Sequence, residues 1–179
     1  MRTEIRISGF GGQGVVLTGY VLGRALTLFE GMEAVMTQSY GPEARGGASS
    51  ANVVISDHSI AYPFVQNPDI LIALSQEAYT RFRPQAKADA QVLIDEDLVK
   101  PFEDDLVRMI PATRLAEELG RRIVANMVML GFFTALTGLV SRESMEKALE
   151  ASVKPKTVAL NLEAFGRGYQ YAAEKEGVK

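Results

Sequence analysis

The stretch that decides the fold is Ile5-Arg6-Ile7-Ser8-Gly9-Phe10-Gly11-Gly12-Gln13-Gly14-Val15-Val16, near the start of the sequence. Apolar and polar residues alternate as far as Ser8, which predicts a short strand. The spacing Gly9-x-Gly11-x-x-Gly14 comes next, and an apolar helix follows it. Strand, glycine turn and helix in this order are typical of a dinucleotide-binding fingerprint, where the first N–H groups of the helix face an anion. The pattern predicts a Rossmann-like first βαβ unit.

A dinucleotide site of the usual kind also needs an acidic residue at the end of the second strand, about 20 residues after the glycines. The second strand is predicted at residues 33–37, and its only acid, Glu33, lies at its beginning. The strand leads into Gln38 and Ser39 instead. A stand-alone dinucleotide-binding oxidoreductase therefore remains an alternative that lacks one of its two expected features.

A second glycine-containing segment reads Gln38-Ser39-Tyr40-Gly41-Pro42-Glu43-Ala44-Arg45-Gly46-Gly47. Its Gly-Pro pair forces a turn, and its paired glycines let other backbone come close. Glu43 and Arg45 can offer a carboxylate and a planar guanidinium to a partner or ligand. A solvated turn with an incidental ion pair is the alternative interpretation.

The whole chain, residues 1–179, is predicted to be a single α/β domain with three layers, α/β/α, and a largely parallel sheet. The runs 70–74 and 91–94 are apolar on both faces, as strands covered by helices on both sides must be. We expect strands at 2–8, 33–37, 51–56, 69–73, 91–95 and 106–111, and helices at 14–30, 77–82, 113–119, 123–136, 141–151 and 155–174.

In a parallel α/β sheet the loops after the carboxyl ends of the strands gather at one edge, so both glycine segments should share one rim. Such a rim suits a phosphate-bearing or carboxylate ligand, or the active-site mouth of a partner subunit. The predicted ligand or subunit contacts are Gly9, Gly11, Gly12, Gln13, Gly14, Gln38, Ser39, Tyr40, Glu43, Arg45, Gly46 and Gly47.

The segment 123–140 carries no charge and just reaches the length of a membrane span. Its polar Asn126 and its glycines favour a buried helix instead. Asn126 should then be hydrogen-bonded to backbone groups. Gly138 is expected to end this helix and Ser141 to cap the next one, with Glu143 in its first turn. Gly19 and Gly23, one turn apart, suit close packing of the first helix onto the sheet.

Taken together, the two glycine segments resemble the gamma subunit, or gamma domain, of 2-oxoacid:ferredoxin oxidoreductases. The resemblance spans nearly the whole chain. It continues through the run 68–74, through Asn126-Met127-Val128-Met129-Leu130-Gly131, and to Asn161 and Ala164-Phe165. The Tyr-Gly-Pro-Glu form of the second segment is most similar to the 2-oxoglutarate branch, since pyruvate-type members more often carry a Phe-Gly-x-Glu-Arg-Arg-Gly-Ala form.

The resemblance implies a subunit of a cytoplasmic enzyme complex. Such complexes carry out coenzyme A-dependent oxidative decarboxylation of a 2-oxoacid, with thiamine diphosphate and magnesium between the alpha and beta parts. Electrons pass through iron–sulfur clusters in cysteine-bearing partners, such as a delta or ferredoxin-like subunit, to ferredoxin. The resemblance therefore implies that this chain supplies no catalytic acid, base or nucleophile and holds no cofactor alone. Its glycine-rich rim would contact coenzyme A or the mouth between the alpha and beta subunits.

Composition limits the chemistry of the chain itself. The net charge of −3 gives no broad basic field, so nucleic acid is not an expected partner. Cysteine is absent, which excludes disulfides, thiolate nucleophiles and cysteine-ligated zinc or iron–sulfur clusters. The single histidine, His58, reads as part of a polar turn. We expect no signal peptide, because charged residues are interleaved in the first strand.

Three classes of function stay open from the sequence. The first is the gamma subunit of a 2-oxoglutarate:ferredoxin oxidoreductase. The second is the stand-alone dinucleotide enzyme. The third is a non-catalytic interaction module, whose relatives would be subunits of indolepyruvate, pyruvate or branched-chain oxoacid complexes. Without its partners, the isolated chain is expected to self-associate through exposed apolar area around Phe10, Tyr40 and Pro42.

Overall fold

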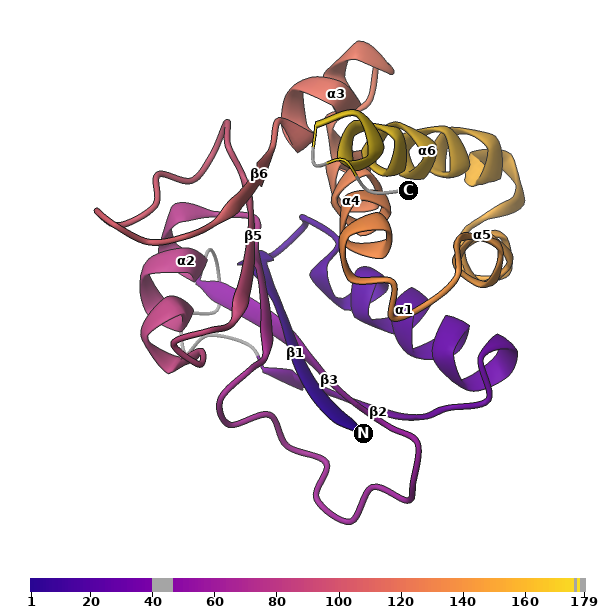
Figure 1. Cartoon of the computed structure of the whole chain (residues 1–179). Helices are drawn as coiled ribbons and strands as arrows, with labels where there is room; N and C mark the ends of the chain where they lie inside the picture. Colours follow the sequence, from indigo (N-terminus) through magenta and orange to yellow (C-terminus); the bar gives the residue numbers. More distant parts are fainter. Residues whose placement is uncertain (40–46, 176, 178–179) are drawn as a thin grey trace.

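The computed structural model describes residues 1–39, 47–175 and 177, and over these ranges it contains one six-stranded sheet and six α-helices (Figure 1). The strands are β1 (Arg2–Phe10), β2 (Glu33–Ser39), β3 (Ala48–Ser56), β4 (Ile70–Ala73), β5 (Gln91–Asp95) and β6 (Arg108–Ile110). The helices are α1 (Val15–Phe29), α2 (Gln76–Phe82), α3 (Ala112–Glu118), α4 (Ala125–Thr137), α5 (Arg142–Glu150) and α6 (Val158–Lys175), with 3-10 turns η1 (Arg83–Gln85), η2 (Arg122–Val124) and η3 (Pro155–Thr157).

The sheet has the order β2-β3-β1-β4-β5-β6 and is mixed. Strands β1, β4, β5 and β6 pair in parallel, whereas β3 is antiparallel to both of its neighbours, β1 and β2. The α/β class and the largely parallel sheet are confirmed. Strand β2 runs in the same direction as β1, as a βαβ unit requires, but β3 lies between the two strands.

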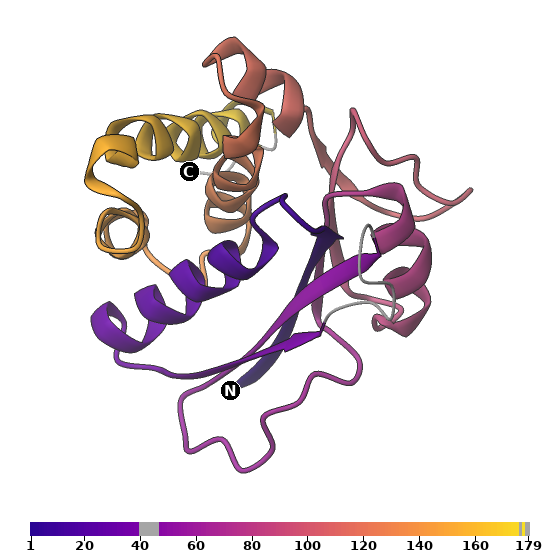
Figure 2. The same ribbon diagram turned by 180° about the vertical axis from the view of Figure 1, so that it is seen from behind.

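Helices cover both faces of the sheet, which gives three layers (Figures 1 and 2). Helices α1, α3, α4, α5 and α6 lie on one face and α2 lies on the other. Successive side chains of a strand point to opposite faces. In β4, accordingly, Ile70 and Ile72 join the larger core under α1 and α4, while Leu71 and Ala73 join the smaller core under α2.

The sequence placed all twelve elements within a few residues of their observed bounds, and the expected end of α4 and cap of α5 were correct. Gly138 closes α4 in the left-handed conformation, and the hydroxyl of Ser141 accepts a hydrogen bond from the N–H of Ser144 at the start of α5. The expected start of α4 at Ile123 was wrong. A 3-10 turn precedes the helix there, and the Ile123 side chain is 66% exposed.

None of the helices that the structure describes is long and apolar enough to cross a membrane. Helix α4 owes its apolar sequence to its position. It packs between the sheet and α6, and ten of its thirteen residues are buried.

Glycines set how closely α4 and α6 approach. A Cβ added to Gly131 of α4 would lie 1.9 Å from the carbonyl oxygen of Phe165, and one added to Gly168 of α6 would lie 1.8 Å from the carbonyl oxygen of Val128. Gly19 of α1 similarly lies against the sheet, since its Cβ would lie 2.8 Å from that of Ala51. The matching expectation for Gly23 was wrong, because no atom lies within 4 Å of the position of its Cβ.

We predict opposite effects from the same substitution at two helical glycines. Gly131→Ala should lower the free energy of unfolding by about 1–3 kcal/mol, because the methyl group forces backbone apart. Gly23→Ala should raise it by up to about 1 kcal/mol, because alanine is the better helix former and its methyl group meets open space. Urea denaturation of both variants measures the difference, and equal values would contradict the close contact between α4 and α6.

Candidate functional site

The candidate site is a crevice at the carboxyl edge of the sheet. Strand β1 leads into α1 on one face, and its neighbour β4 leads into α2 on the opposite face (Figure 1). The two connections therefore diverge and leave a gap between the strand ends. In open α/β sheets this topological switch point is where ligands usually bind.

The glycine turn after β1 is held in place by the side chain of Gln13. Its Oε1 accepts a hydrogen bond from the N–H of Phe10 at 2.7 Å, and its Nε2 donates to the carbonyl of Leu74 at 2.8 Å. The backbone N–H of Gln13 donates to the Phe10 carbonyl at 3.2 Å. Gln13 thus joins the ends of β1 and β4, and its own N–H is used inside the turn. A Cβ at Gly9 would collide with this amide, at 2.6 Å from Oε1.

Asn126, in the first turn of α4, fastens the start of α1. Its Nδ2 donates to the carbonyl of Gly14 and to the hydroxyl of Thr18, both at 3.3 Å. Gly14 is left-handed, with φ of 72°, and a Cβ there would lie 2.3 Å from Asn126 Nδ2. The expectation that buried Asn126 is hydrogen-bonded is confirmed, with one backbone and one side-chain partner. Only glycine fits at position 14, for both its conformation and its contact.

Asp95 ends β5 at the same edge, and the residue is buried, with 1% of its surface exposed. Oδ2 accepts from the N–H of Thr113 at 3.0 Å and from its hydroxyl at 2.6 Å, and Oδ1 accepts from the N–H of Asp97 at 3.1 Å. Burial raises the pKa of the carboxyl group, and these hydrogen bonds oppose the rise. Sequence reasoning missed Asp95, although an acid closing an apolar strand is a recognisable signal of this edge.

Two cavities meet at this edge and share Gly12, Ile123 and Asn126 in their walls. The first, about 270 Å³, lies over the strand ends beside Gln13 and Asp95. The second, about 460 Å³, lies between the glycine turn and the α5–α6 connection. Basic side chains stand at their walls, with Arg122 at the first and Arg121 and Lys154 at the second. The arrangement can accept an anionic group or an acidic segment of another protein.

The second glycine segment begins and ends at the same edge of the sheet. Ser39 at the end of β2 lies opposite Ser50 of β3, and Phe10 at the end of β1 lies opposite Ala48. Ser39 and Gln38 are exposed, as are Gly11 and Gly12. The ends of β1 and β2 therefore do share one edge. Four of the predicted contacts, Tyr40, Glu43, Arg45 and Gly46, lie outside the described residues, while Gly47 directly precedes β3.

No group of three or more His, Cys, Asp or Glu side chains among the residues that the structure describes could hold a metal ion. His58 lies in an exposed turn after β3, with its Nδ1 2.7 Å from Asp57 Oδ1.

Comparison with known proteins identifies the family. The model described as pyruvate ferredoxin/flavodoxin oxidoreductase matches residues 4–171. The chain belongs to this family. A family member in Methanocaldococcus jannaschii, the 2-oxoglutarate synthase subunit KorC, is 55% identical, over 97% of this chain and 96% of the relative.

Two further similar proteins are subunits of related oxidoreductases. The gamma subunit of a keto/oxoacid ferredoxin oxidoreductase from Geobacter sulfurreducens PCA has a solved structure with a TM-score of 0.87 and 40% identity, covering 97% of this chain and 98% of that one. The ketoisovalerate oxidoreductase subunit VorA of Methanothermobacter thermautotrophicus is 37% identical over 96% of this chain, but the match covers only 36% of VorA. In VorA the matched region is therefore about one third of a longer polypeptide.

We predict that Asn126→Asp destabilises the chain by about 3 kcal/mol at neutral pH. The substitution keeps the shape, removes the donor to Gly14 and Thr18, and brings a buried carboxylate against a carbonyl oxygen. Burial should raise the pKa of the new carboxyl group, so the loss should shrink toward acid pH, where the protonated form can donate again.

The matched control is Asn67→Asp. Asn67 is exposed, and its Nδ2 also donates to a backbone carbonyl, that of Gln85, at 3.0 Å. Because water can replace this bond, we expect a change below about 1 kcal/mol. Thermal denaturation at several pH values compares the two variants, and equal effects would show that Asn126 does not hold the turn.

Proposed function

We propose that this chain is the gamma subunit of a 2-oxoglutarate:ferredoxin oxidoreductase, an enzyme for coenzyme A-dependent oxidative decarboxylation. It contributes the rim around the crevice, next to the active site, and no catalytic group. The observation that carries the proposal is the convergence of the glycine turn, the end of β2 and the basic cavity walls at one edge of the sheet. The full-length likeness to a 2-oxoglutarate synthase subunit supports the choice of branch.

The resemblance to the family implies a division of labour within the complex. Thiamine diphosphate with magnesium would lie between the alpha and beta subunits, and the iron–sulfur clusters in a delta or ferredoxin-like subunit that passes electrons to ferredoxin. The sequence of this chain agrees with that division, because it has no cysteine and offers no thiolate to a cluster. Thiamine diphosphate supplies carbanion stabilisation when bound. For coenzyme A, Arg121, Lys154 and the glycine turn would be the groups that meet phosphate or the neighbouring subunits.

A stand-alone dinucleotide enzyme fits the topology less well. In the dinucleotide fold the second parallel strand lies directly beside the first and carries the ribose-binding acid. Here the antiparallel β3 occupies that position, and Ser39 ends β2. Subunits of pyruvate, indolepyruvate or branched-chain oxoacid complexes remain the other candidates.

We predict that the isolated chain neither oxidises 2-oxoacids nor binds NAD or NADP tightly. It has no cysteine ligand for a cluster, and no acid stands at the end of β2. Calorimetric titration with both nucleotides measures binding, and an activity assay with 2-oxoglutarate, coenzyme A and a ferredoxin acceptor measures turnover. Submicromolar binding of either nucleotide would overturn the subunit assignment. Activity that appears only after the alpha and beta subunits are added would support it.

A further prediction concerns Arg45, which lies between Glu43 and the paired glycines in the sequence. Lysine keeps the charge but loses the planar guanidinium that bonds an anion through two N–H groups. Arg45→Lys should weaken coenzyme A-dependent turnover of the reconstituted complex about tenfold or more, the effect of one lost charged hydrogen bond. Steady-state kinetics with coenzyme A varied measures it, alongside a melting curve of the subunit. Unchanged kinetics would show that Arg45 does not contact coenzyme A or the active site. A large fall in melting temperature would show that Arg45 stabilises the fold of this chain instead.

A further inference from the structure

The parallel ladder between β1 and β4 stops at the edge of the crevice. In its last regular pair Ser8 lies opposite Ala73, and the N–H of Leu74 donates to the carbonyl of Ser8 at 2.8 Å. The hydrogen bonds of a parallel ladder are evenly spaced along each strand, so the next donor on β1 is two residues further on. This register makes the next bond of the ladder one from the N–H of Phe10 to the carbonyl of Leu74.

The side-chain amide of Gln13 lies in the place of that bond. Its Oε1 accepts from the N–H of Phe10 at 2.7 Å, and its Nε2 donates to the carbonyl of Leu74 at 2.8 Å. The two backbone groups that the ladder would join are therefore bonded to opposite ends of one planar amide. Two hydrogen bonds with an amide between them span more than the single bond of about 2.9 Å that joins neighbouring strands. The inserted amide thus holds the ends of β1 and β4 apart.

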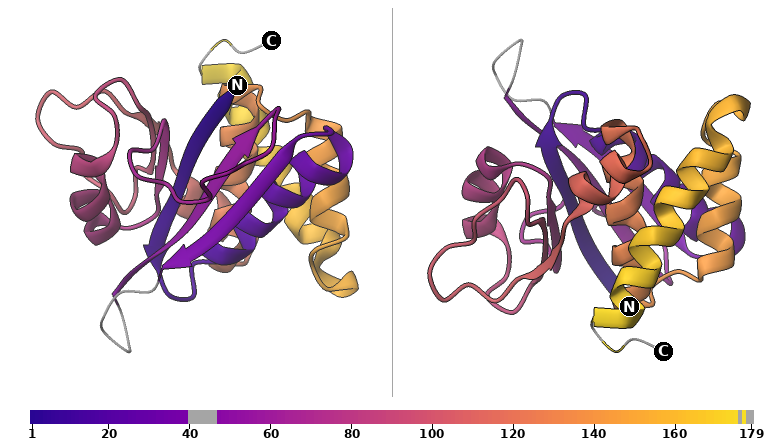
Figure 3. Two further views of the ribbon diagram at one scale, coloured as in Figure 1. Left: turned by 90° about the horizontal axis from the view of Figure 1, so that it is seen from below. Right: turned by 90° about the horizontal axis from the view of Figure 1, so that it is seen from above.

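Gly9 leaves the room that the amide occupies. A Cβ at this position would lie 2.6 Å from Oε1 of Gln13 and 3.1 Å from the Cβ of Leu74. The turn lies at the end of β1 that is farthest from the N-terminus, where the chain continues into α1 (Figure 3). Its position relative to β4 therefore depends on an amide that belongs to the turn itself.

The same amide shapes the crevice. Gln13 and Leu74 both line the cavity of about 270 Å³ over the strand ends. A direct bond between Phe10 and Leu74 would bring the two strand ends together beneath this cavity.

The polar atoms of the turn divide into two groups. Both polar atoms of the Gln13 side chain are bonded within the chain. In the part of the chain that the structure describes, no acceptor is bonded to the N–H groups of Gly11 and Gly12, which are exposed. The two glycines are therefore placed to meet a ligand, whereas the side chain of Gln13 is placed to hold them.

We propose that Gln13 is a positioning residue for coenzyme A. Its inserted amide sets the separation of β1 and β4 and thereby the position of the turn, without touching the ligand. The inference rests on the proposed function, in which the glycine turn is one of the groups offered to coenzyme A. It separates Gln13 from Gly11 and Gly12, with which it was grouped as a contact residue in the sequence.

Gln13→Glu tests the donor half of the bridge. The carboxylate still accepts from Phe10, but its second oxygen faces the Leu74 carbonyl without a hydrogen to donate. In the reconstituted complex at about pH 8, the KM for coenzyme A should rise about tenfold, with kcat at saturating coenzyme A unchanged. The protonated carboxyl group can donate to that carbonyl again. The ratio of this KM to that of the unchanged chain should therefore fall toward one at about pH 5.5.

Two uncharged changes distinguish positioning from contact. Gln13→Ala removes the bridge, and Gly9→Ala expels the amide from its place while keeping it in the chain. Each should raise the KM for coenzyme A by a similar factor at both pH values. The double variant should show the same factor once, since both changes remove one bridge. A side chain that bonds the ligand directly would instead give effects that multiply.

The matched control is Gln76→Glu. The Gln76 amide also bridges backbone groups, with Oε1 accepting from the N–H of Lys100 at 2.7 Å and Nε2 donating to its carbonyl at 3.2 Å. Gln76 lines neither cavity of the crevice, so this variant should leave the KM for coenzyme A unchanged at both pH values. Melting curves of every variant accompany the kinetics.

Four results in an active complex would overturn the inference. They are an unchanged KM in Gln13→Glu at about pH 8, a rise that persists undiminished at about pH 5.5, an equal rise in Gln76→Glu, and multiplying effects in the double variant. Where the melting curves show that an alanine variant does not fold, the pH dependence of Gln13→Glu decides alone. A complex of unchanged subunits that has no coenzyme A-dependent turnover would refute the proposed function, and this inference with it.

Discussion

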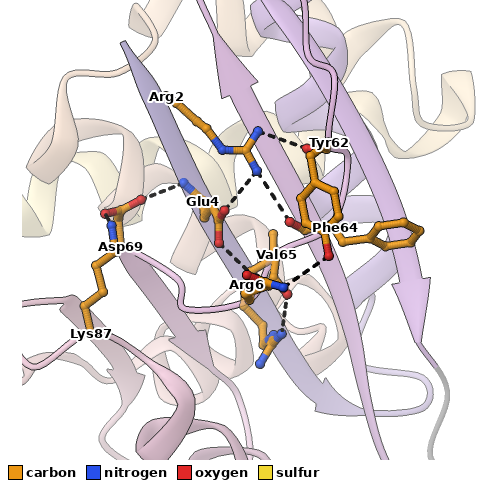
Figure 4. Close-up of polar contacts among 9 residues, drawn as sticks. Arg2, Glu4, Arg6, Tyr62, Phe64, Val65, Asp69 and Lys87 are labelled. Atoms are coloured by element: carbon orange, nitrogen blue, oxygen red, sulfur yellow. Dashed lines mark hydrogen bonds and ion pairs between the residues drawn. The ribbon is translucent and has the colours of Figure 1, made fainter.

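Strand β1 has one apolar face and one polar face, and the rest of the molecule depends on how each face is covered. Ile5 and Ile7 point into the larger core, while Arg2, Glu4 and Arg6 point to the opposite face. The polar side chains of β1 need hydrogen-bond partners that an apolar helix surface does not supply. On that face Arg6 stacks on Phe82 of α2, and the segment 57–69 beside it, which joins β3 to β4, supplies backbone partners to Arg2, Glu4 and Arg6 (Figure 4). The alternation of apolar and polar residues along β1 therefore accounts both for its contribution to the larger core and for the attachment of the segment 57–69.

The elements were predictable because the sequence repeats their signals locally. Apolar runs marked β4 and β5, and Gly138 and Ser141 marked the gap between α4 and α5. The pairing of strands was not predictable in the same way. Because β2 follows α1 in the sequence, it is expected beside β1. The sequences of these two strands do not predict that β3 lies between them. Strand order depends on contacts between distant residues, which leave no periodic trace in one sequence.

The candidate site was predictable only in part, for a related reason. Glycine spacing pointed to the turn at Gly9–Gly14, but the two amides that hold the turn come from different ranges of the chain. Gln13 lay inside the motif and was counted as a contact through its backbone, whereas its side chain ties β1 to β4. Asn126 was recognised as a polar residue on an apolar helix, but its bond to Gly14 spans 112 positions of sequence. Asp95 closes an apolar strand in the sequence, but its hydrogen bonds to Thr113 appear only once α3 is placed beside the end of β5.

The close contact of α4 and α6 has a mechanical consequence. With the carbonyls of Val128 and Phe165 lying against bare glycine backbone, the two helices cannot slide or rotate past each other without collision, so they move as one lever. At one end of this helix pair, Asn126 of α4 donates a hydrogen bond to the carbonyl of Gly14 at the start of α1. The other helix of the pair is α6, at the C-terminal end of the chain. A displacement of α6 would therefore carry α4 with it and, through Asn126, reach the start of α1. Connections that bend, such as the 3-10 turns before α4 and α6, are where such a displacement would be absorbed.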